Sequence, residues 1–497
     1  MTARPGALSV GARLRQTAIE LGDAVAMRSI RARDDYREIG WRELDRRSEQ
    51  LANQLLAMDV VQRPATVVLL TRDAVDHAIY AYGAWKAGQR VLCLSPAIGE
   101  VEGKSILSRL GRTISFGDRL SWDTSERSAD FASMPEAWDG VDRVARQMLL
   151  LASGGSTGIP KLIDAIGAGQ FVPGDFLGGL GAALKRQSRS RAFVCTPLSH
   201  GAGAATAYMA MFEQCEVTSL ERFDPDVTLW AVRRFRLEQL TMVPTMMDRI
   251  ARSPSFDPEH LESVTTLVHT GAHIDPAVKE VWIEMIGAPK VLEVYGSTES
   301  VGHFVIDGED WLQHRGSVGR AVNCKVRIIS SDGKDLPPGE IGEIFVKPLV
   351  GNVDPATKYV GSQLRMKSHE DYVSVGDLGH LDADGYLHVD GRTDDLIITG
   401  GSNVYPDEIE ILVRRLVPVA DCVVVGKPHA DMGQTVHAVV SLAPGAHPFG
   451  IEELRAALRG RLTPYKMPRS MEVVPEIQRS DAGKVRRSRY LADTVVR

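Results

Sequence analysis

The residues of this 497-residue chain that could do chemistry stand out first in one short stretch. Residues 149–161 read LLLASGGSTGIPK, so an apolar run leads into three glycines, hydroxyl side chains and a lysine. Glycines in such a turn leave successive backbone N–H groups uncovered, and these groups can curl around an anion. The spacing differs from the GxxxxGK[ST] pattern of a Walker phosphate loop. The stretch therefore predicts an anion-binding loop, with a flexible glycine–serine linker as the alternative.

Further polar stretches follow apolar runs later in the chain. Residues 294–300 read VYGSTES and combine an aromatic ring, a glycine, hydroxyl groups and a carboxylate. Residues 375–395 read VGDLGHLDADGYLHVDGRTDD, and residues 480–487 read SDAGKVRR. Each stretch alone is a weak indication of function, but together and in this order they are distinctive.

The composition excludes several classes of protein. The formal net charge is −6, from 58 basic and 64 acidic residues, so nothing indicates a nucleic-acid-binding surface. The five cysteines are scattered and never have CxxC spacing, which argues against a disulfide framework or a zinc site and favours a reducing compartment. The N-terminus lacks the apolar core of a signal peptide, and no later segment is long and apolar enough to span a bilayer. We therefore expect a soluble cytoplasmic protein without a transmembrane segment.

The elements that must position these loops alternate between strand and helix. Residues 65–70 predict a strand, 74–88 a helix and 90–96 a second strand, and similar alternations recur up to about residue 300. Asp275-Pro276 predicts a helix start, since proline suits the first turn. This pattern is typical of an α/β protein with parallel sheets flanked by helices, and the length allows more than one core.

The pattern changes after about residue 371. Residues 386–392 and 396–401 predict short hairpin strands, with Asp384-Gly385 as a turn. An amphipathic helix over 405–417, strands over 421–426 and 435–442, and a helix over 451–462 then predict a small α+β domain. Its boundary is expected in the polar stretch 390–395.

Taken in order, these motifs resemble those of the adenylate-forming enzymes: acyl- and aryl-CoA synthetases, peptide-synthetase adenylation domains and beetle luciferases. SGGSTGIPK resembles the family's phosphate loop, VYGSTES its adenine and magnesium motif, and GDLGHLDADGYLHVDGRTDD its ribose and hinge motif. GGSNVYPDEIE (400–410) resembles the loop lining the pantetheine tunnel of CoA ligases, and AGK (482–484) the catalytic-lysine motif. The resemblance implies a large multi-subdomain N-terminal domain over 1–393, which binds AMP and the acid. It also implies a small mobile C-terminal domain over 394–497, which carries the catalytic lysine.

The resemblance also implies a role for each matched residue. The phosphates of ATP are expected to contact Ser153, Gly154, Gly155, Ser156, Thr157, Gly158 and Lys161, although Gly155 stands where the family usually has a hydroxyl residue. The adenine is expected at Tyr295, Gly296, Gly271, Ala272 and Glu293, and the ribose at Asp377 and Arg392. Thr298 is expected to bond the α-phosphate, Glu299 with Thr157 to hold Mg²⁺, and His200 to lie beside the acid. Lys484 is expected to stabilise the adenylation transition state, Asp394 to act as the hinge, and Gly400 with Gly401 to face coenzyme A.

Each of these residue types also has an ordinary structural explanation. Tyrosines are commonly half-buried, and a lone glutamate is usually a solvated surface group. An arginine such as Arg392 often forms a surface ion pair, a lone histidine is more often structural, and Lys484 could belong to a solvated basic tail. Gln478, which stands where proline is usual, is a further departure from the family pattern.

The predicted activity is that of an ATP-dependent, AMP-forming acid–CoA ligase that uses ATP, Mg²⁺ and coenzyme A. The small residues of HGAGAATAY (200–208) would leave volume in the acid pocket, with helix packing as the alternative. DWLQHRGSVGR (310–320) also resembles ligases of bile acids and steroid side-chain acids. We therefore expect a bulky hydrophobic acid, whether polycyclic, aromatic or long. The alternatives are an enzyme that loads a carrier protein in trans and a catalytically silent nucleotide-binding homologue. The expected partners are a small-molecule acid and CoA, with a second copy of the chain if the enzyme is a homodimer. No nucleic-acid partner is expected.

Overall fold

The structure is a computed structural model. It describes residues 7–118, 120–126, 141–145, 147–153, 161–166, 169–172, 179–349, 358–362, 364–447, 449–480 and 483–491. The chain divides into two compact units. The first comprises Met1–Ser153, Ile159–Lys325 and Val346–Met366, and the second Gly154–Gly158, Val326–Phe345 and Lys367–Arg497. The division into domains 1–393 and 394–497 stays a prediction.

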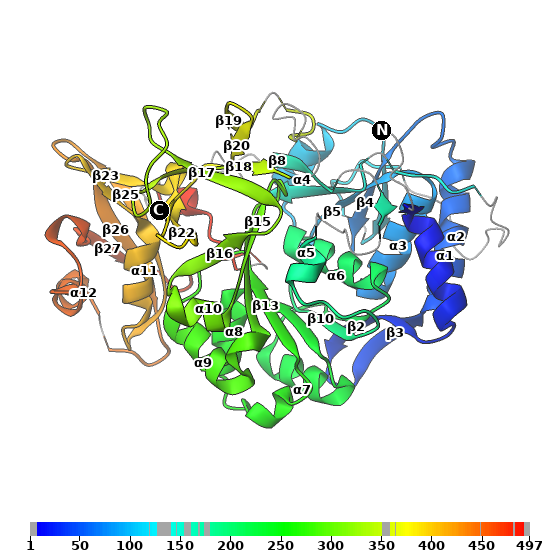
Figure 1. Ribbon diagram of the computed structural model, residues 1–497, viewed down its shortest axis with the longest axis horizontal. Coiled ribbons are helices and arrows are strands. Elements are labelled where there is room, and N and C mark those ends of the chain that lie inside the picture. The colour runs from blue at the N-terminus through cyan, green and yellow to red at the C-terminus, as the bar shows by residue number, and fades with distance from the viewer. Residues whose placement is uncertain are drawn as a thin grey trace. The chain divides into compact units, whose positions relative to one another are not determined.

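One five-stranded sheet of the first unit leads into the predicted anion-binding loop. Its strand order is β6-β4-β5-β7-β8, with β6 at Thr113–Gly117, β4 at Thr66–Leu70, β5 at Arg90–Cys93, β7 at Leu149–Ser153 and β8 at Lys161–Ile166. The first four strands are parallel and β8 is antiparallel to β7. Helix α3 (Ala74–Lys86) connects β4 to β5, which confirms the strand–helix–strand prediction (Figure 1). The glycine–serine loop therefore begins at the carboxyl end of a parallel strand.

A second, larger sheet of the first unit contains six parallel strands. In sheet order these are β14 (Val291–Gly296), β13 (Thr266–Thr270), β12 (Gln239–Met242), β10 (Arg191–Val194), β11 (Glu216–Leu220) and β2 (Val25–Ala32). Antiparallel strands extend both sides: β15 (His303–Asp307) and β16 (Ser317–Ala321) beyond β14, and β3 (Asp35–Gly40) beyond β2. A two-stranded ladder pairs β1 (Leu8–Ser9) with β9 (Gln170–Phe171).

The helices of the first unit follow the strands in the alternation expected from the sequence. They are α1 (Val10–Leu21), α2 (Trp41–Ala57), α4 (Glu100–Leu107), α5 (Leu180–Ala183), α6 (Gly201–Phe212), α7 (Pro225–Phe235), α8 (Pro244–Ala251), α9 (Pro276–Ile286) and α10 (Gly308–Gln313), with short 3-10 turns η2 (Pro258–Leu261) and η3 (Ala288–Lys290). The helix start at Asp275-Pro276 is confirmed, because the Asp275 side chain accepts a hydrogen bond from the Ala277 N–H. Trp41 and Trp85 are fully buried in the core between α2, α3 and the sheets.

A further group of strands spans residues 324–392, most of which belong to the second unit. Their order is β19 (Lys367–His369), β20 (Tyr372–Ser374), β18 (Gly342–Pro348), β21 (Asp377–Leu381) and β22 (Leu387–Arg392), and β17 (Cys324–Ile329) also pairs with β18. The turn at Asp384-Gly385 is confirmed, since Gly385 has φ of 80°. However, β22 pairs with β21 and not with the strand that follows it. That next strand has a two-glycine turn of its own and pairs with its own successor.

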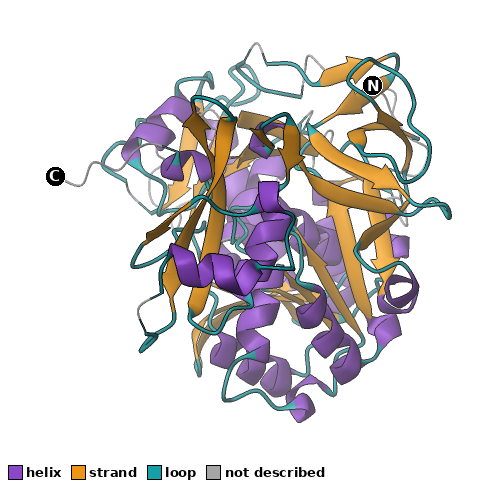
Figure 2. Cartoon of the chain, turned by 90° about the vertical axis from the view of Figure 1, so that its left-hand side faces the viewer, coloured by secondary structure: helices purple, strands orange, loops and turns teal. Residues whose placement is uncertain are grey.

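The remainder of the second unit is the small α+β fold expected from the sequence. After the short turn η4 (Thr393–Asp395), the sheet order is β24 (Ser402–Val404), β23 (Ile397–Thr399), β26 (Gly433–Leu442) and β25 (Val419–His429), with β27 (Ser470–Val473) beside β26. Helices α11 (Pro406–Arg414) and α12 (Ile451–Leu458) bury apolar side chains against this sheet. Short turns η5 (Pro464–Lys466) and η6 (Arg487–Tyr490) complete the elements, and Figure 2 distinguishes the helices from the strands. The predicted mixed α/β class is thus observed in both units.

Candidate active site

Strands β7 and β8 place the two ends of the predicted phosphate loop opposite each other. Ser153 ends β7 and lies opposite Lys161, the first residue of β8. The loop residues Gly154, Gly155, Ser156, Thr157 and Gly158 lie outside the described residues. The ammonium of Lys161 lies 5.2 Å from the ring centre of Tyr359. Lys161 is therefore held at the foot of the loop and faces an aromatic side chain that the motifs did not indicate.

Glu299 shares the same tyrosine. The Tyr359 hydroxyl donates a hydrogen bond of 3.0 Å to Oε1 of Glu299, and both side chains are buried. Tyr359 itself is fixed by backbone pairing with β8: Val360 N–H donates to the Leu162 carbonyl, and Asp164 N–H donates to the Lys358 carbonyl. One residue thus connects the predicted magnesium ligand with the strand that leaves the phosphate loop.

A cation accompanies this carboxylate. Burial lowers the pKa of Lys358, while the nearby Asp164 and Glu299 oppose that shift. The Lys358 ammonium donates to the Asp164 carbonyl oxygen at 2.8 Å. The carboxylate of Glu299 therefore lies in a polar environment inside the first unit, unlike the solvated surface glutamate that was its ordinary explanation.

The N-terminus of α6 brings Thr298 beside β7. A methyl group placed on Gly201 would lie 3.0 Å from Cδ1 of Leu151 in β7 and 3.6 Å from Cγ2 of Thr298. His200 is the residue before the helix, and its N–H donates to the Pro197 carbonyl. The first unit therefore brings together Lys161, the neighbouring residues Thr298 and Glu299, and the start of α6, three stretches that lie far apart in the sequence.

The predicted adenine residues lie at the carboxyl ends of two neighbouring parallel strands. Gly271 directly follows β13, and Tyr295 and Gly296 end β14. The strands are in register, with Thr270 opposite Val294. Gly271 has φ of 88°, a conformation that favours glycine. Tyr295 is half-buried, with its ring centre 5.7 Å from that of Phe304. Ligands of open α/β sheets bind at such carboxyl edges.

Glu293, in contrast, is engaged in a buried ion pair. Lys279 of α9 donates to its Oε2 at 2.6 Å, and His269 Nε2 lies 3.8 Å from the same oxygen. Burial works to raise the pKa of Glu293, but the neighbouring His269 and Lys279 hold it below its ordinary value. This ion pair explains the glutamate by itself, so its contact with adenine stays a prediction without structural support.

The second unit carries the predicted ribose residues as a cross-strand pair. Asp377 begins β21 and lies opposite Arg392, which ends β22. The Nε atom of Arg392 lies 3.0 Å from Oδ1 of Asp377, and the arginine also donates to the Val375 carbonyl. The carboxylate is largely shielded, whereas the guanidinium is half-exposed. The pair presents an acceptor and a cation at one end of this hairpin.

The remaining predicted residues also lie in the second unit. Asp394 is in the turn η4, directly between β22 and β23. Gly400 and Gly401 form the turn between β23 and β24, with φ of 56° and 80°, and Gly400 N–H donates to the Met432 carbonyl. Lys484 is exposed and follows Gly483 in a tight turn. All of these residues lie in turns between elements, and their roles stay predictions.

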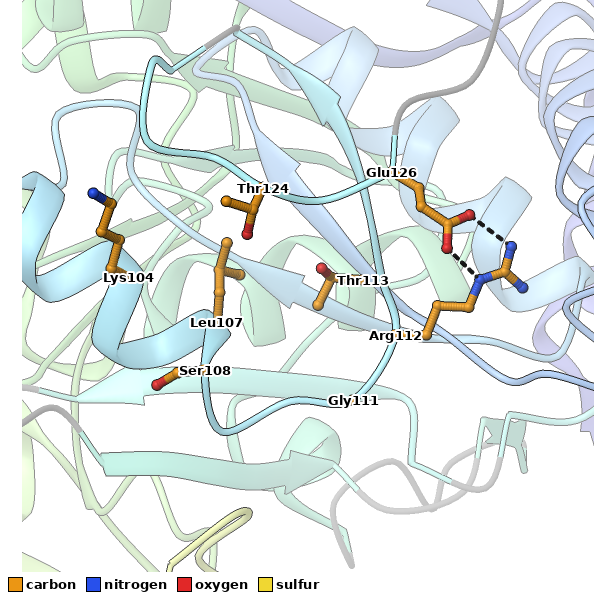
Figure 3. A pocket seen from close by; sticks show the side chains of 8 residues that line it. All are labelled: Lys104, Leu107, Ser108, Gly111, Arg112, Thr113, Thr124 and Glu126. Carbon is orange, nitrogen blue, oxygen red and sulfur yellow. Dashed lines mark hydrogen bonds and ion pairs between the residues drawn. The ribbon is translucent and has the colours of Figure 1, made fainter.

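The motifs missed several residues that the structure connects to predicted ones. Tyr359 and Lys358 lie in a stretch without a recognisable motif, so only the pairing with β8 reveals them. Arg479 contacts the Lys484 turn directly, and Asp421 binds Arg479 from the neighbouring strand β25. A cavity of about 340 Å³ in the first unit (Figure 3) lies elsewhere, since none of the predicted site residues lines it. Its lining residues are Lys104, Leu107, Ser108, Gly111, Arg112, Thr113, Thr124 and Glu126.

The residues present fit a magnesium ion that is shared with a nucleotide. Among the described residues no group of three or more histidine, cysteine, aspartate or glutamate side chains is arranged to hold a metal alone. Mg²⁺ commonly takes one or two carboxylates together with substrate phosphates. Glu299 beside the ends of β7 and β8 supplies one such carboxylate.

In the part of the chain that the structure describes, no helix is long and apolar enough to cross a membrane.

Comparison with known families identifies the class of protein. The sequence model described as "AMP-binding enzyme" matches residues 14–349, and that of the "AMP-binding enzyme C-terminal domain" matches residues 408–484. The chain therefore belongs to the AMP-binding enzyme family, and the predicted resemblance to adenylate-forming enzymes is confirmed.

The relatives narrow this class to acyl-CoA synthetases. Feruloyl-CoA synthase of Amycolatopsis sp is 29% identical, covering 89% of this chain and 91% of that protein. Indoleacetate–CoA ligase of Aromatoleum aromaticum is 34% identical over 54% of this chain and 52% of the ligase, so that alignment spans about half of each protein. The medium/long-chain-fatty-acid–CoA/3-oxocholest-4-en-26-oate–CoA ligase of Mycobacterium tuberculosis is 28% identical, over 72% and 68%.

A solved structure supports the fold. o-Succinylbenzoate CoA synthetase of Bacillus subtilis in complex with its acyl-adenylate has a TM-score of 0.80 and 23% identity, covering 99% of this chain and 98% of that one. This likeness confirms the predicted α/β fold class. The family model and the relatives confirm the enzyme class of AMP-forming acyl-CoA synthetase and the use of ATP and CoA. The magnesium ion stays a prediction. The site roles stay predictions.

Proposed function

We propose that this acid–CoA ligase acts on a bulky hydrophobic carboxylic acid. A carboxylate oxygen of the acid attacks the α-phosphorus of ATP, the bond to the bridging oxygen breaks, and pyrophosphate leaves. The thiol of CoA then attacks the carbonyl carbon of the acyl-adenylate and loses its proton, and AMP departs. The observation that carries the ligase chemistry is that Lys161 and Glu299 both contact Tyr359 in the first unit, while Thr298, next to Glu299, lies beside the start of α6.

The roles proposed for individual residues follow from their charge. Lys161 and Thr298 offer a cation and a hydroxyl donor to phosphate oxygens, and Lys484 offers an ammonium to the charge that develops as pyrophosphate leaves. A donor aimed at such developing charge typically contributes about 3 kcal/mol or more to transition-state stabilisation. Glu299 would hold magnesium, which supplies charge neutralisation of the phosphates when bound. Asp377 and Arg392 would bind the ribose, with the carboxylate accepting from the hydroxyl groups.

The preference for a bulky acid is supported by helix α6. Gly203 is required by packing, since a methyl group there would lie 2.2 Å from the Pro197 carbonyl oxygen. Ala202, Ala205 and Thr206 share another face of the helix, are only half-buried and have small side chains. Helix packing therefore explains part of the small-residue pattern, and the half-buried face supports a wide acid pocket. Relatives named for ferulate, indoleacetate and a steroid acid are consistent with such a pocket.

Pyrophosphate release with a panel of acids, with and without CoA, tests this proposal. We expect release to depend on a bulky hydrophobic acid, whether polycyclic, aromatic or long, and acyl-CoA to form only when CoA is added. Release with acetate as fast as with bulky acids would contradict the substrate class. Acyl transfer to a phosphopantetheinylated carrier protein but not to CoA would favour the carrier-loading alternative. A homodimer and a cytoplasmic location stay predictions from the sequence.

A further inference from the structure

The lysine predicted to be catalytic lies on a turn that closes on itself. The Lys484 carbonyl accepts a hydrogen bond of 2.9 Å from the Ser480 N–H, and the Lys484 N–H donates to the Ser480 hydroxyl at 3.2 Å. Gly483 N–H donates to the Ser480 carbonyl at 2.7 Å, and Arg479 pairs with Val485 across the base of the turn. The backbone of Lys484 is therefore set by the position of this turn, although its side chain is exposed.

Arg479 attaches the turn to the sheet of the C-terminal α+β fold. Its Nε and Nη2 atoms donate to the two carboxylate oxygens of Asp421 at 2.6 and 2.7 Å, and its Nη1 atom donates to the Gly483 carbonyl at 2.9 Å. Asp421 lies in β25 and is itself oriented by the Cys422 N–H at 2.8 Å. The Arg479 side chain is only 17% exposed. A fork of this kind fixes both distance and orientation, because the planar guanidinium has no rotational freedom left.

A second arginine holds the chain after the turn, but it does so differently. Arg487 forms ion pairs with Asp407 and Glu410 of α11, and with Asp395 at 3.5 Å, and it donates to the Val424 carbonyl. Glu410 is buried, so Arg487 compensates a buried charge and belongs to the core of the fold. Arg479, by contrast, donates one of its three hydrogen bonds to the carbonyl of Gly483, the residue that directly precedes Lys484.

We infer that Arg479, oriented by Asp421, is a positioning residue that sets the location of Lys484 for adenylation. This inference rests on the proposed role of Lys484. A lysine has four rotatable side-chain bonds, so a loosely placed backbone would add to an already flexible side chain and reduce the fraction of ammonium groups in the reactive geometry. Misplacement of a reacting group by about 1 Å can cost about 100-fold in rate. Loss of the Arg479 fork should therefore slow adenylation, by about 10- to 100-fold.

The test separates the two half-reactions of the full-length enzyme. Adenylation is measured as acid-dependent pyrophosphate release, and thioester formation is measured from a chemically prepared acyl-adenylate plus CoA. We expect Arg479→Gln to lower the adenylation kcat by about 10- to 100-fold while the KM for ATP and the thioester step change by less than about threefold. Asp421→Asn, which keeps the arginine, should have a smaller effect in the same direction. Arg327→Gln is the matched control, since Arg327 forms a similar two-oxygen pair with Asp335 on another part of the second unit.

A double-mutant cycle distinguishes an effect of Arg479 through Lys484 from a general structural effect. If Arg479 acts through Lys484, then Arg479→Gln should slow adenylation no further in a Lys484→Ala background. A further slowing in that background, or an equal fall in both half-reactions, would overturn the inference. Should Arg479→Gln fail to fold, Asp421→Asn is used in the same cycle, and the same two outcomes decide the question. Normal adenylation by Lys484→Ala alone would instead refute the proposed role of the lysine, so the two failures are distinguishable.

Discussion

Removing one hydroxyl group, by Tyr359→Phe, should weaken metal binding in the presence of nucleotide. The Tyr359 hydroxyl donates to the Glu299 carboxylate at 3.0 Å, and the exposed fractions of the two residues are 6% and 8%. Phenylalanine keeps the ring beside Lys161 and the pairing with β8, so the substitution removes the hydroxyl group that donates to Glu299. The carboxylate then loses the hydroxyl donor that holds one of its oxygens.

The magnitude follows from the kind of hydrogen bond. A hydrogen bond to a charged group contributes about 1.5–3 kcal/mol, and loss of an outer partner of a metal ligand typically costs about 10- to 100-fold in affinity. Because the nucleotide phosphates would also hold the metal, we expect a loss near the lower limit, about 10-fold.

The assay is direct binding of Mn²⁺ followed by electron paramagnetic resonance, with a non-hydrolysable ATP analogue present, and it does not depend on turnover. Tyr208→Phe is the matched control, since it removes another buried tyrosine hydroxyl, one that bonds His77 at 2.7 Å. Glu299→Gln should abolish the protein-dependent part of Mn²⁺ binding. If Tyr359→Phe bound Mn²⁺ as tightly as the unaltered enzyme while Glu299→Gln did not, the reasoning would be refuted.

Two other predictions concern stability and substrate size. Burial lowers the pKa of His77 to about 3. In the unfolded chain this histidine has its ordinary pKa of about 6.5, so as the pH falls the unfolded state takes up the proton first. The contribution of neutral His77 to the free energy of unfolding is therefore fully present above pH 6.5 and declines toward pH 3. Between pH 8 and pH 5 this histidine alone should lower the free energy of unfolding by about 2 kcal/mol. In urea unfolding, His77→Phe should therefore lose about 2 kcal/mol less than the unaltered protein over this pH range. An identical loss in both proteins would contradict the assignment. Ala205→Phe, on the half-buried face of α6, should lower kcat/KM for a polycyclic acid by about 10-fold or more and leave a short aliphatic acid less affected, which competition between the two acids would measure. Equal effects on both acids would place Ala205 outside the pocket.

The local elements of the fold were predictable because they have local causes. The alternation around β4, α3 and β5 and the Asp275 cap depend on residues close together in the sequence, and all of them are observed. The pairing of β22 was not predicted, because the two-glycine turn at Gly400 gives the following strand a partner of its own.

The connections within the site were less accessible. Tyr359 lies 60 positions after Glu299, and no spacing or periodicity links a donor and an acceptor so far apart. The motif placed Glu293 near the adenine, whereas its carboxylate pairs with Lys279 of α9, a helix that the motif does not include. Arg479 looks like one more cation in a basic tail until Asp421 is placed beside it by folding. Motifs identify the groups that carry the chemistry, and long-range packing decides which groups hold them.

The central claim is that the acid becomes joined to AMP before the thiol reacts. Its most direct measurement uses an acid labelled with ¹⁸O in both carboxylate oxygens, with ATP and CoA, followed by mass spectrometry of the products. We predict that AMP gains one labelled oxygen, because the bond broken by the thiol lies between that oxygen and the carbonyl carbon. Unlabelled AMP together with labelled inorganic phosphate would contradict the account.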